Sequence, residues 1–417
     1  MSRLQFRELR VENYRCFETL TLSLEADTTV LFAENGGGKT ALLTALAMGL
    51  AAFQVGTSQD LKLDRHRDPR MRTLGETARR EPVGKCEITW TAQVGDEELP
   101  TWSTIADPRT QRVSNKRKSI QDALERTRVP GGPWPLFAWY GVDRLGRQHP
   151  GRRKVVRTGD RWEAYESALD PSLDEAPLLQ WLQDEMLGDL ARREQGEPER
   201  FLHTTVMEAV ARATPRVTGA WYDPVEQGPA VRFKDGHVAP WSELSDGYHV
   251  YMTLVADIAR RAVMLNQFDA GKAADRVEGV ILIDELDLHL HPRWQRVALP
   301  GLRRVFPRLQ LVVTTHSPQV LSSVENRQVR WLVNGELREH DVHVWGRDTN
   351  AILRDHMHTD DRDEAGNDML RDLYDAVDGG DRNAATRLLE RLRRRWGDDD
   401  PELIRAQGFL DDELSED

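Results

Sequence analysis

The sequence predicts an α/β fold built around a partly parallel sheet. Two short runs, 280–283 and 311–314, are almost wholly apolar, which is typical of strands buried on both faces of such a sheet. A third apolar run, 29–32, leads through a glycine-rich turn into the apolar helical run 41–53. A strand, a glycine-rich turn and a helix in this order are the pattern of a phosphate-binding loop.

The period of the apolar residues predicts the other elements. Strands are predicted, in chain order, at 4–12, 18–24, 29–32, 85–94, 98–105, 135–141, 217–241, 280–283 and 311–314. Helices are predicted over 41–53, 175–213 and 246–265, followed by two or three amphipathic helices from about 364 onward. The polar stretches 57–82 and 106–130 predict loops, with one short helix near 117–126.

Bulk composition narrows the class of protein. A chain with 39% apolar and 30% charged residues fits a soluble protein, and no run has the length and apolar character of a membrane span. Two cysteines are too few for a disulfide framework or a cysteine-rich zinc site. We therefore expect a cytoplasmic protein without a membrane association.

The charge is unevenly distributed. The net charge of −12 argues against wholesale coating of nucleic acid, yet the stretch 144–161 is strongly basic, with Asp160 as its one acidic residue. Such a stretch is either a solvated loop or a contact for the phosphate backbone of DNA or RNA. The sequence leaves both readings open.

The glycine-rich turn carries the first candidate site. Main-chain N–H groups of Gly36, Gly37 and Gly38 can surround an anion, and the start of the following helix adds partial positive charge. In this pattern Lys39 reaches the β- and γ-phosphates of ATP, and the hydroxyl of Thr40 ligates Mg²⁺. The first glycine of the pattern is replaced by Ala33.

Polar residues end the two buried strands. Asp284 and Glu285 follow the run 280–283. An acid at Asp284 can hold the Mg²⁺ that Thr40 also ligates, and Glu285 can orient or deprotonate the attacking water. His316 follows the run 311–314, where it could sense the γ-phosphate. The alternatives are a helix-capping acid pair and an ordinary strand-end histidine.

A second candidate anion site lies at Ser245 and Gly247, before the helix predicted over 246–265. A serine and a glycine at a helix N-terminus can bind an anion, although in isolation they would form an ordinary helix cap. Together with the phosphate-binding loop, they suggest a composite site. In it, Ser245 and Gly247 of one copy close over the ATP held by Lys39 of another copy, which implies a homodimer or higher homo-oligomer.

The order of these motifs resembles the ATP-binding-cassette head of the SMC and RecF group. Leu244-Ser245-Asp246-Gly247 matches that group's signature motif, Asp284-Glu285 its Walker B pair and His316 its switch histidine. The resemblance implies an ATPase whose mixed sheet is flanked by helices, with a short helical insertion and a helical C-terminal tail. It also implies that Asn35 belongs to the phosphate-binding loop and that Arg15 lies near the phosphates.

Further segments are similar to compact RecF-like ATPases of prokaryotic defence systems, in particular those of Septu and related retron systems. The segments are 139–144, 287–292, 314–321 and the tail 345–410. In those systems the ATPase assembles with a separate HNH nuclease, which would make this chain an ATP-operated switch subunit. The expected divisions are an N-terminal ATPase lobe 1–145, a middle segment 146–240, a C-terminal ATPase lobe 241–345 and the tail 346–417.

Two other functions remain as alternatives. One is a RecF-like DNA-repair ATPase that binds DNA without a nuclease partner. The other is a nuclease like the overcoming-lysogenisation-defect family, but no Glu-Gly strand end or Asp-x-Asp cluster follows His316 on an apolar strand. Gln93 and Gln148 are candidates for the group's Q-loop residue.

Two features allow both a structural and a functional reading. His289 and His291 have no further ligand at a recognisable spacing, so a structural or dimer-interface role is favoured over a metal site. The apolar stripe of the helix around 384–396 either packs on the chain's own core or docks the nuclease.

Overall fold

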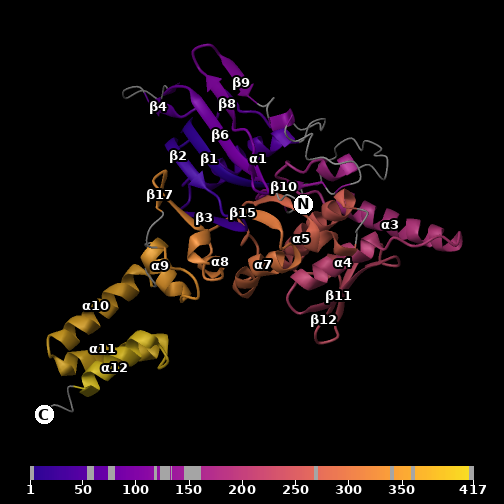
Figure 1. Cartoon of the computed structure of the whole chain (residues 1–417). Coiled ribbons are helices and arrows are strands. Elements are labelled where there is room, and N and C mark those ends of the chain that lie inside the picture. Colours follow the sequence, from indigo (N-terminus) through magenta and orange to yellow (C-terminus); the bar gives the residue numbers. More distant parts are fainter. Residues whose placement is uncertain are drawn as a thin grey trace. The chain divides into compact units, whose positions relative to one another are not determined.

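The computed structural model describes residues 4–53, 61–73, 80–116, 120–122, 132, 134–144, 161–266, 271–338, 342–357 and 362–412. The chain forms two compact units, residues 1–347 and 348–417 (Figure 1). Most of the basic stretch 144–161, including Gln148, lies outside the described residues, as does most of the helix predicted near 117–126. The α/β class with a mixed sheet is confirmed.

The central sheet of the first unit has the strand order β10-β14-β15-β3-β16-β17. Its strands are β10 (Leu136–Tyr140), β14 (Gly279–Ile283), β15 (Leu309–Thr315), β3 (Thr28–Ala33), β16 (Val329–Val333) and β17 (Glu336–Arg338). The first five are parallel, and β17 runs antiparallel to β16. The register pairs Tyr140 with Ile283 and Thr315 with Phe32. The segments that follow β10, β14, β15 and β3 therefore emerge along one edge of the sheet.

The second sheet is antiparallel, with the order β2-β1-β6-β8-β9. It consists of β2 (Phe17–Ser23), β1 (Leu4–Tyr14), β6 (Cys86–Val94), β8 (Trp102–Asp107), β9 (Arg112–Lys116) and the short β7 (Glu97–Glu98), and a separate small hairpin joins β4 (Met71–Thr73) and β5 (Arg80–Pro82). Strand β9 lies in the stretch predicted to be a loop. All 5 of its residues are exposed, so it has no apolar alternation by which a sequence pattern could reveal it.

Helix α1 (Lys39–Leu50) lies between the two sheets (Figure 1). The Trp90 indole N–H on β6 donates to the carbonyl of Ala45 at 2.9 Å, and the Tyr14 hydroxyl on β1 donates to the carbonyl of Ala41 at 3.2 Å. A Cβ on Gly49 would lie 2.6 Å from the Trp90 ring. The antiparallel sheet thus clamps the helix that follows the phosphate-binding loop.

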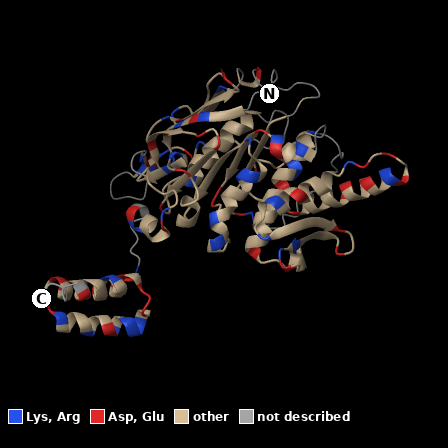
Figure 2. Cartoon of the chain, turned by 60° about the horizontal axis from the view of Figure 1, so that its bottom comes forward, with Lys and Arg blue, Asp and Glu red and all other residues tan. Residues whose placement is uncertain are grey.

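The 3₁₀ helix η1 (Ala51–Phe53) continues α1, and its Phe53 ring packs against Phe6 and Trp102 of the antiparallel sheet. The remaining elements of the first unit are the 3₁₀ helices η2 (Arg161–Tyr165), η3 (Trp241–Glu243) and η5 (Asn326–Gln328), the helices α3 (Ala176–Glu194), α4 (Leu202–Ala213), α5 (Asp246–Leu265), α6 (Ala273–Arg276), α7 (Pro292–Val305) and α8 (Pro318–Leu321), and the sheet of β11 (Val217–Asp223), β12 (Gly228–Phe233) and β13 (Val238–Pro240). The main helices, among them α4, α5 and α7, lie on the opposite side of the central sheet from α1 (Figure 1). Acidic residues recur along α3, and two arginines, Arg192 and Arg193, lie in its last turn before Glu194 (Figure 2).

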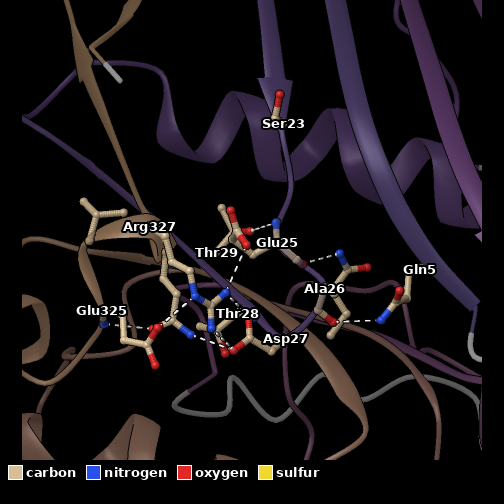
Figure 3. A network of polar contacts seen from close by, with 12 residues as sticks. Gln5, Ser23, Glu25, Ala26, Asp27, Thr28, Thr29, Glu325 and Arg327 are labelled. Carbon is tan, nitrogen blue, oxygen red and sulfur yellow. Dashed lines mark hydrogen bonds and ion pairs between the residues drawn. The ribbon is translucent and has the colours of Figure 1, made fainter. Parts of the chain in front are cut away.

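A network of ion pairs fixes the start of β3, the strand that leads into the phosphate-binding loop (Figure 3). Arg327 contacts Asp27 and Glu25, each at 3.0 Å, and Arg330 contacts Glu25 at 2.9 Å. Burial opposes the charge of Asp27, yet the hydrogen bonds from Arg327 hold the pKa of that carboxyl below its usual range. The segment before β16 is thereby joined to the segment before β3.

The second unit consists of α9 (Thr349–Met357), α10 (Glu364–Asp378), α11 (Arg382–Trp396) and α12 (Pro401–Asp412). Its core is formed by buried side chains of α10, α11 and α12, namely Leu373, Val377, Ala385, Leu389, Leu392, Leu403, Ala406 and Leu410. The apolar stripe of α11 therefore packs within this unit. Ile404 and Phe409 on α12 remain 56% and 49% exposed.

Across the described residues, no helix combines the length and the apolar character that a membrane crossing requires.

Candidate nucleotide-binding site

The loop between β3 and α1 has the backbone that an anion cradle requires. Gly36 and Gly38 adopt φ values of 80° and 91°, a left-handed region that glycine enters without strain. A Cβ on Gly38 would lie 2.4 Å from the Phe17 ring and 2.7 Å from the Cys16 sulfur. A Cβ on Gly37 would lie 2.7 Å from that of Ala33. Gly38 is thus required both by close packing and by its dihedral angle, Gly37 by close packing and Gly36 by its dihedral angle.

Lys39 lies within this loop, with 6% of its surface exposed. Its ammonium donates to the carbonyls of Ala33 at 2.9 Å and Glu34 at 3.3 Å. Burial lowers the pKa of Lys39, while the carboxylates of Glu285 and Asp284 oppose that shift. The carbonyls hold the ammonium at the mouth of the loop, where a phosphate oxygen could replace them as its partner.

A hydrogen-bonded chain of side chains joins α1 to the neighbouring strand ends. The Thr40 hydroxyl donates to Asp284 Oδ2 at 2.7 Å, and the Thr314 hydroxyl donates to Asp284 Oδ1 at 2.5 Å. The same Thr314 oxygen accepts from the N–H of Glu285 at 2.7 Å. The hydroxyl and carboxylate oxygens of Thr40 and Asp284 are the donors that Mg²⁺ prefers, so this pair fits a magnesium site.

Glu285 follows directly and adopts a left-handed backbone, with φ of 47°. Its carbonyl and that of Asp284 accept hydrogen bonds from the guanidinium of Arg144. Arg144 comes from the segment after β10, on the other side of β14 from β15. The Walker B pair is therefore held from two sides, by Thr314 and by Arg144.

His316 follows β15 at the same edge of the sheet. Its N–H lies 3.4 Å from Asp287 Oδ1, which also accepts from the Thr315 hydroxyl at 2.5 Å. Burial lowers the pKa of His316, and the positive charge of Lys39 lowers it further. The shift favours the neutral imidazole, which lies in the field of the Lys39 ammonium, while the carboxylates of Glu285, Asp287 and Asp284 oppose the shift.

Ser245 and Gly247 begin α5. Ser245 is the N-cap residue, yet its side chain makes no capping hydrogen bond within the described part of the chain, and it is exposed. A Cβ on Gly247 would lie 2.6 Å from the carbonyl of His289. Glycine at this position lets the start of α5 approach the segment after the Walker B pair.

Arg15 lies beside α1, one helical turn beyond Thr40. Its Nε donates to Asp68 Oδ1 at 2.9 Å, and a terminal nitrogen lies 3.5 Å from the Thr44 hydroxyl. Thr44 in turn donates to the carbonyl of Thr40 at 2.7 Å. Asn35 belongs to the loop and is exposed.

Three further residues singled out by the sequence have contacts of their own. Gln93 donates to Gln5 Oε1 at 3.2 Å within the antiparallel sheet. His291 caps α7, accepting from the N–H of Arg293 at 3.3 Å, and His289 adopts φ of 63°. The described residues contain no group of three or more His, Cys, Asp or Glu side chains that could hold a metal ion.

Sequence reasoning left three contributors to this site without a role, namely Thr314, Asp287 and Arg144. Thr314 and Asp287 are polar residues inside or just after otherwise apolar strand motifs, which is the signal that could have found them. Arg144 belongs to the segment 139–144, but only the pairing of β10 with β14 shows which residues it contacts.

Two family models and several named proteins match the chain. Residues 8–185 match the family described as "AAA domain", and residues 207–322 match the family described as "AAA domain, putative AbiEii toxin, Type IV TA system". The chain is 23% identical to the "Retron Ec83 probable ATPase" of Escherichia coli, over 99% of this chain and 88% of that protein. Both matching family models describe AAA domains, and both lie within the first unit.

The chain also resembles two further proteins over less of its length. It is 25% identical to the "Septu protein PtuA" of Bacillus mycoides, over 79% of this chain and 40% of that protein. Among solved structures, the SMC head domain from Thermotoga maritima is 12% identical with a TM-score of 0.46, over 81% of this chain and 100% of that one.

Proposed function

We propose that the ATPase is an ATP-operated switch subunit of a prokaryotic antiphage defence complex that controls a separate nuclease. The observation that carries the ATP part is the 2.7 Å hydrogen bond between Thr40 and Asp284. It joins the phosphate-binding loop after β3 to the Walker B segment after β14, across β15, the strand that His316 follows. Three sequence motifs far apart in the chain thus meet at one edge of the sheet.

Each residue has a distinct part in hydrolysis. The loop N–H groups from Asn35 to Gly38 and the ammonium of Lys39 hold the phosphates, and Thr40 with Asp284 would hold Mg²⁺, which neutralises charge on the transferring phosphoryl group. Glu285 accepts a proton from the attacking water. His316 donates a hydrogen bond toward the γ-phosphate.

The site is completed by a second copy of the chain. Ser245 is exposed and makes no capping bond within the described residues, so its hydroxyl and the helix N-terminus are available to a phosphate. In the proposal, Ser245 and Gly247 of one copy close over the ATP held by Lys39 of the other. Binding energy from the γ-phosphate then favours the dimer, and hydrolysis releases it.

The proposed nuclease partner is supported by the names of the relatives. One is named as a retron ATPase and another as a Septu protein, and the resemblance to those systems implies a separate nuclease of the HNH type. The exposed Ile404 and Phe409 of α12 are available to such a partner, whereas the α11 stripe is used within the unit.

Two measurements on Glu285→Gln test the switch. We expect this variant to bind ATP and Mg²⁺ and to accumulate as a dimer in size-exclusion chromatography with light scattering, because the amide cannot accept the proton. Lys39→Ala is the control and should remain monomeric under the same conditions. A Glu285→Gln chain that still turns over ATP would contradict the assigned role of Glu285.

The composite site has its own test. Turnover per protomer of the unaltered chain should rise with protein concentration through the range in which the dimer forms. Ser245→Arg should abolish that rise while leaving binding of ATP to the monomer intact, because Ser245 acts on the partner's nucleotide. Turnover that is independent of concentration would rule out a shared site.

A further inference from the structure

Arg144 is a buried arginine whose hydrogen bonds to the described residues all end on main-chain carbonyls. Its guanidinium donates to the carbonyl of Gly141 at 3.0 Å and to those of Asp284 and Glu285. Only 4% of its surface is exposed. Burial lowers its pKa to about 10, and the nearby carboxylates, Asp284 first among them, oppose that shift. The arginine therefore stays charged at neutral pH, against the energetic cost of its burial.

The segment that carries Arg144 is fixed by its neighbours. Strand β10 ends at Tyr140, whose carbonyl accepts from the N–H of Asp284 at 2.7 Å. The N–H of Gly141 donates to the carbonyl of Pro171 at 2.7 Å, and a Cβ on Gly141 would lie 2.5 Å from the Pro171 ring. The turn from Gly141 to Arg144 is thus wedged between Pro171 and the end of β14.

We propose that Arg144 is a positioning residue for ATP hydrolysis, which sets the direction of the Glu285 side chain by holding the carbonyls on either side of the Glu285 N–H. The inference rests on the proposed role of Glu285. Glu285 has a φ of 47°, a conformation that a non-glycine residue keeps only when its surroundings enforce it. Arg144 fixes its carbonyl and Thr314 fixes its N–H.

A planar guanidinium is suited to this task. It presents five N–H donors in a rigid fork, whereas a lysine ammonium is a point charge on a flexible stem. Arg144→Lys keeps the positive charge but cannot hold the carbonyls of Gly141, Asp284 and Glu285 together in one geometry. The substitution therefore separates the positioning of Glu285 from the charge near it.

The chain offers a matched control at the opposite end of the same sheet. Arg303 on α7 also donates only to carbonyls among the described residues, those of Asp27 at 3.4 Å, Leu309 at 2.7 Å and Pro307 at 3.1 Å. Burial lowers its pKa as well. Asp27 and Leu309 lie at the starts of β3 and β15, so Arg303→Lys makes the same chemical change far from the phosphate-binding edge.

The experiment compares Arg144→Lys and Arg303→Lys in the full chain, by single-turnover hydrolysis, binding of a fluorescent ATP analogue and thermal unfolding. We expect Arg144→Lys to lower the hydrolysis rate about 10- to 100-fold, as a small misplacement of a reacting group does, with ATP affinity unchanged. Arg303→Lys should hydrolyse ATP like the unaltered chain. If Arg144→Lys loses ATP affinity and thermal stability together with hydrolysis, the inference is overturned, because Arg144 would then have a general structural role.

A double-mutant cycle with Glu285→Gln supplies the decisive readout. If Arg144 acts through Glu285, adding Arg144→Lys to Glu285→Gln causes no further loss of hydrolysis, because residues that act as one unit are not additive. Fully additive losses would overturn the inference. If the Arg144→Lys variant hydrolyses ATP at the wild-type rate while the Glu285→Gln variant is inactive, the positioning inference is overturned and the proposed function stands. Wild-type hydrolysis by Glu285→Gln would overturn the proposed function and the inference with it.

Discussion

The hydroxyl of Thr314 serves two neighbours at once, as donor to Asp284 Oδ1 at 2.5 Å and as acceptor from the N–H of Glu285 at 2.7 Å. Thr314→Val keeps the shape of the side chain and removes both bonds. We expect the free energy of unfolding to fall by about 1–3 kcal/mol, because buried polar groups lose their partner. Hydrolysis should fall while ATP binding remains, as urea titration and single-turnover assays would show.

Thr28→Val is the control for that change. Thr28 is 1% exposed at the start of β3, and its hydroxyl has no hydrogen-bond partner among the described residues. Replacing it with valine should therefore be neutral or stabilising and leave hydrolysis unchanged. A loss at Thr28→Val as large as that at Thr314→Val would show that valine itself, and not the two hydrogen bonds, causes the effect.

Gly38 gives the second prediction at the scale of the residue. Its φ is 91° and an added Cβ would lie 2.4 Å from the Phe17 ring, so Gly38→Ala must displace either the loop or β2. We expect binding of a fluorescent ATP analogue to be lost. Gly36→Ala shares the positive φ but meets nothing within 4 Å, and its loss of affinity should be smaller. Equal affinities for the two variants would refute the packing argument.

How far the sequence predicts the site depends on the kind of interaction. Lys39, Thr40, Asp284 and Glu285 follow from local motifs, because each motif is a strand end with a fixed spacing. The contacts of Arg144 with Asp284 and Glu285 depend on which strand pairs with β14, and the sequence holds no local sign of that pairing. The roles of Arg15, Ser245 and His316 stay predictions, since nothing bound to the chain tests them.

At the scale of elements, strands and helices whose apolar residues recur with a clear period are present in the structure. Elements without such a period could not be predicted from the sequence. The buried strands β14 and β15 and the helix α5 match their predicted ranges closely. The sequence predicts a loop where β9 lies, because the stretch 106–130 is polar and rich in arginine. All 5 residues of β9 are exposed, and the strand pairs with β8. Main-chain pairing leaves no trace in the order of apolar side chains.

The start of α5 provides a prediction about pH. His249 on α5 contacts Glu175, the N-cap residue of α3, at 2.9 Å, and this hydrogen bond raises the pKa of His249 above 6.5. Because the folded pKa is the higher one, the pair stabilises the fold fully below 6.5, and the stabilisation is lost as pH rises through the raised pKa. His249→Gln should therefore lower the free energy of unfolding at acidic pH and change it little at alkaline pH.

The size of this effect is limited by exposure. The two side chains are 34% and 28% exposed, and solvent screening keeps such a pair to about 0.2–1 kcal/mol. Urea unfolding at about pH 5.5 and about pH 8.5, on either side of histidine titration, would measure it. His237→Gln, an exposed histidine in a turn, should show no such dependence. A destabilisation by His249→Gln that is the same at both pH values would contradict the ion-pair account.

At the scale of the molecule, the second unit has its own core and the nucleotide site lies wholly in the first. A chain that ends at Arg347 should therefore bind ATP like the full chain, because the residues proposed to hold ATP come from unit 1. We expect the same truncation to abolish co-purification of the proposed nuclease partner. Retention of the nuclease by the truncated chain would remove the second unit from the proposed interface.

A finer change separates docking from folding of the second unit. Ile404→Glu with Phe409→Glu alters two exposed apolar side chains of α12 and leaves the buried Leu403 and Leu410 in place. The helical signal in circular dichroism should persist while the nuclease is lost. Arg387→Glu, an exposed charge change on α11, is the control that should retain the nuclease.

The packing of Cys16 against the phosphate-binding loop has a practical consequence. The sequence contains 2 cysteines, of which Cys16 is exposed and Cys86 is buried. The unaltered protein can therefore be labelled with a thiol-reactive fluorophore at one position, beside Gly38. A dye there would report arrival and departure of nucleotide in real time, without any engineered cysteine.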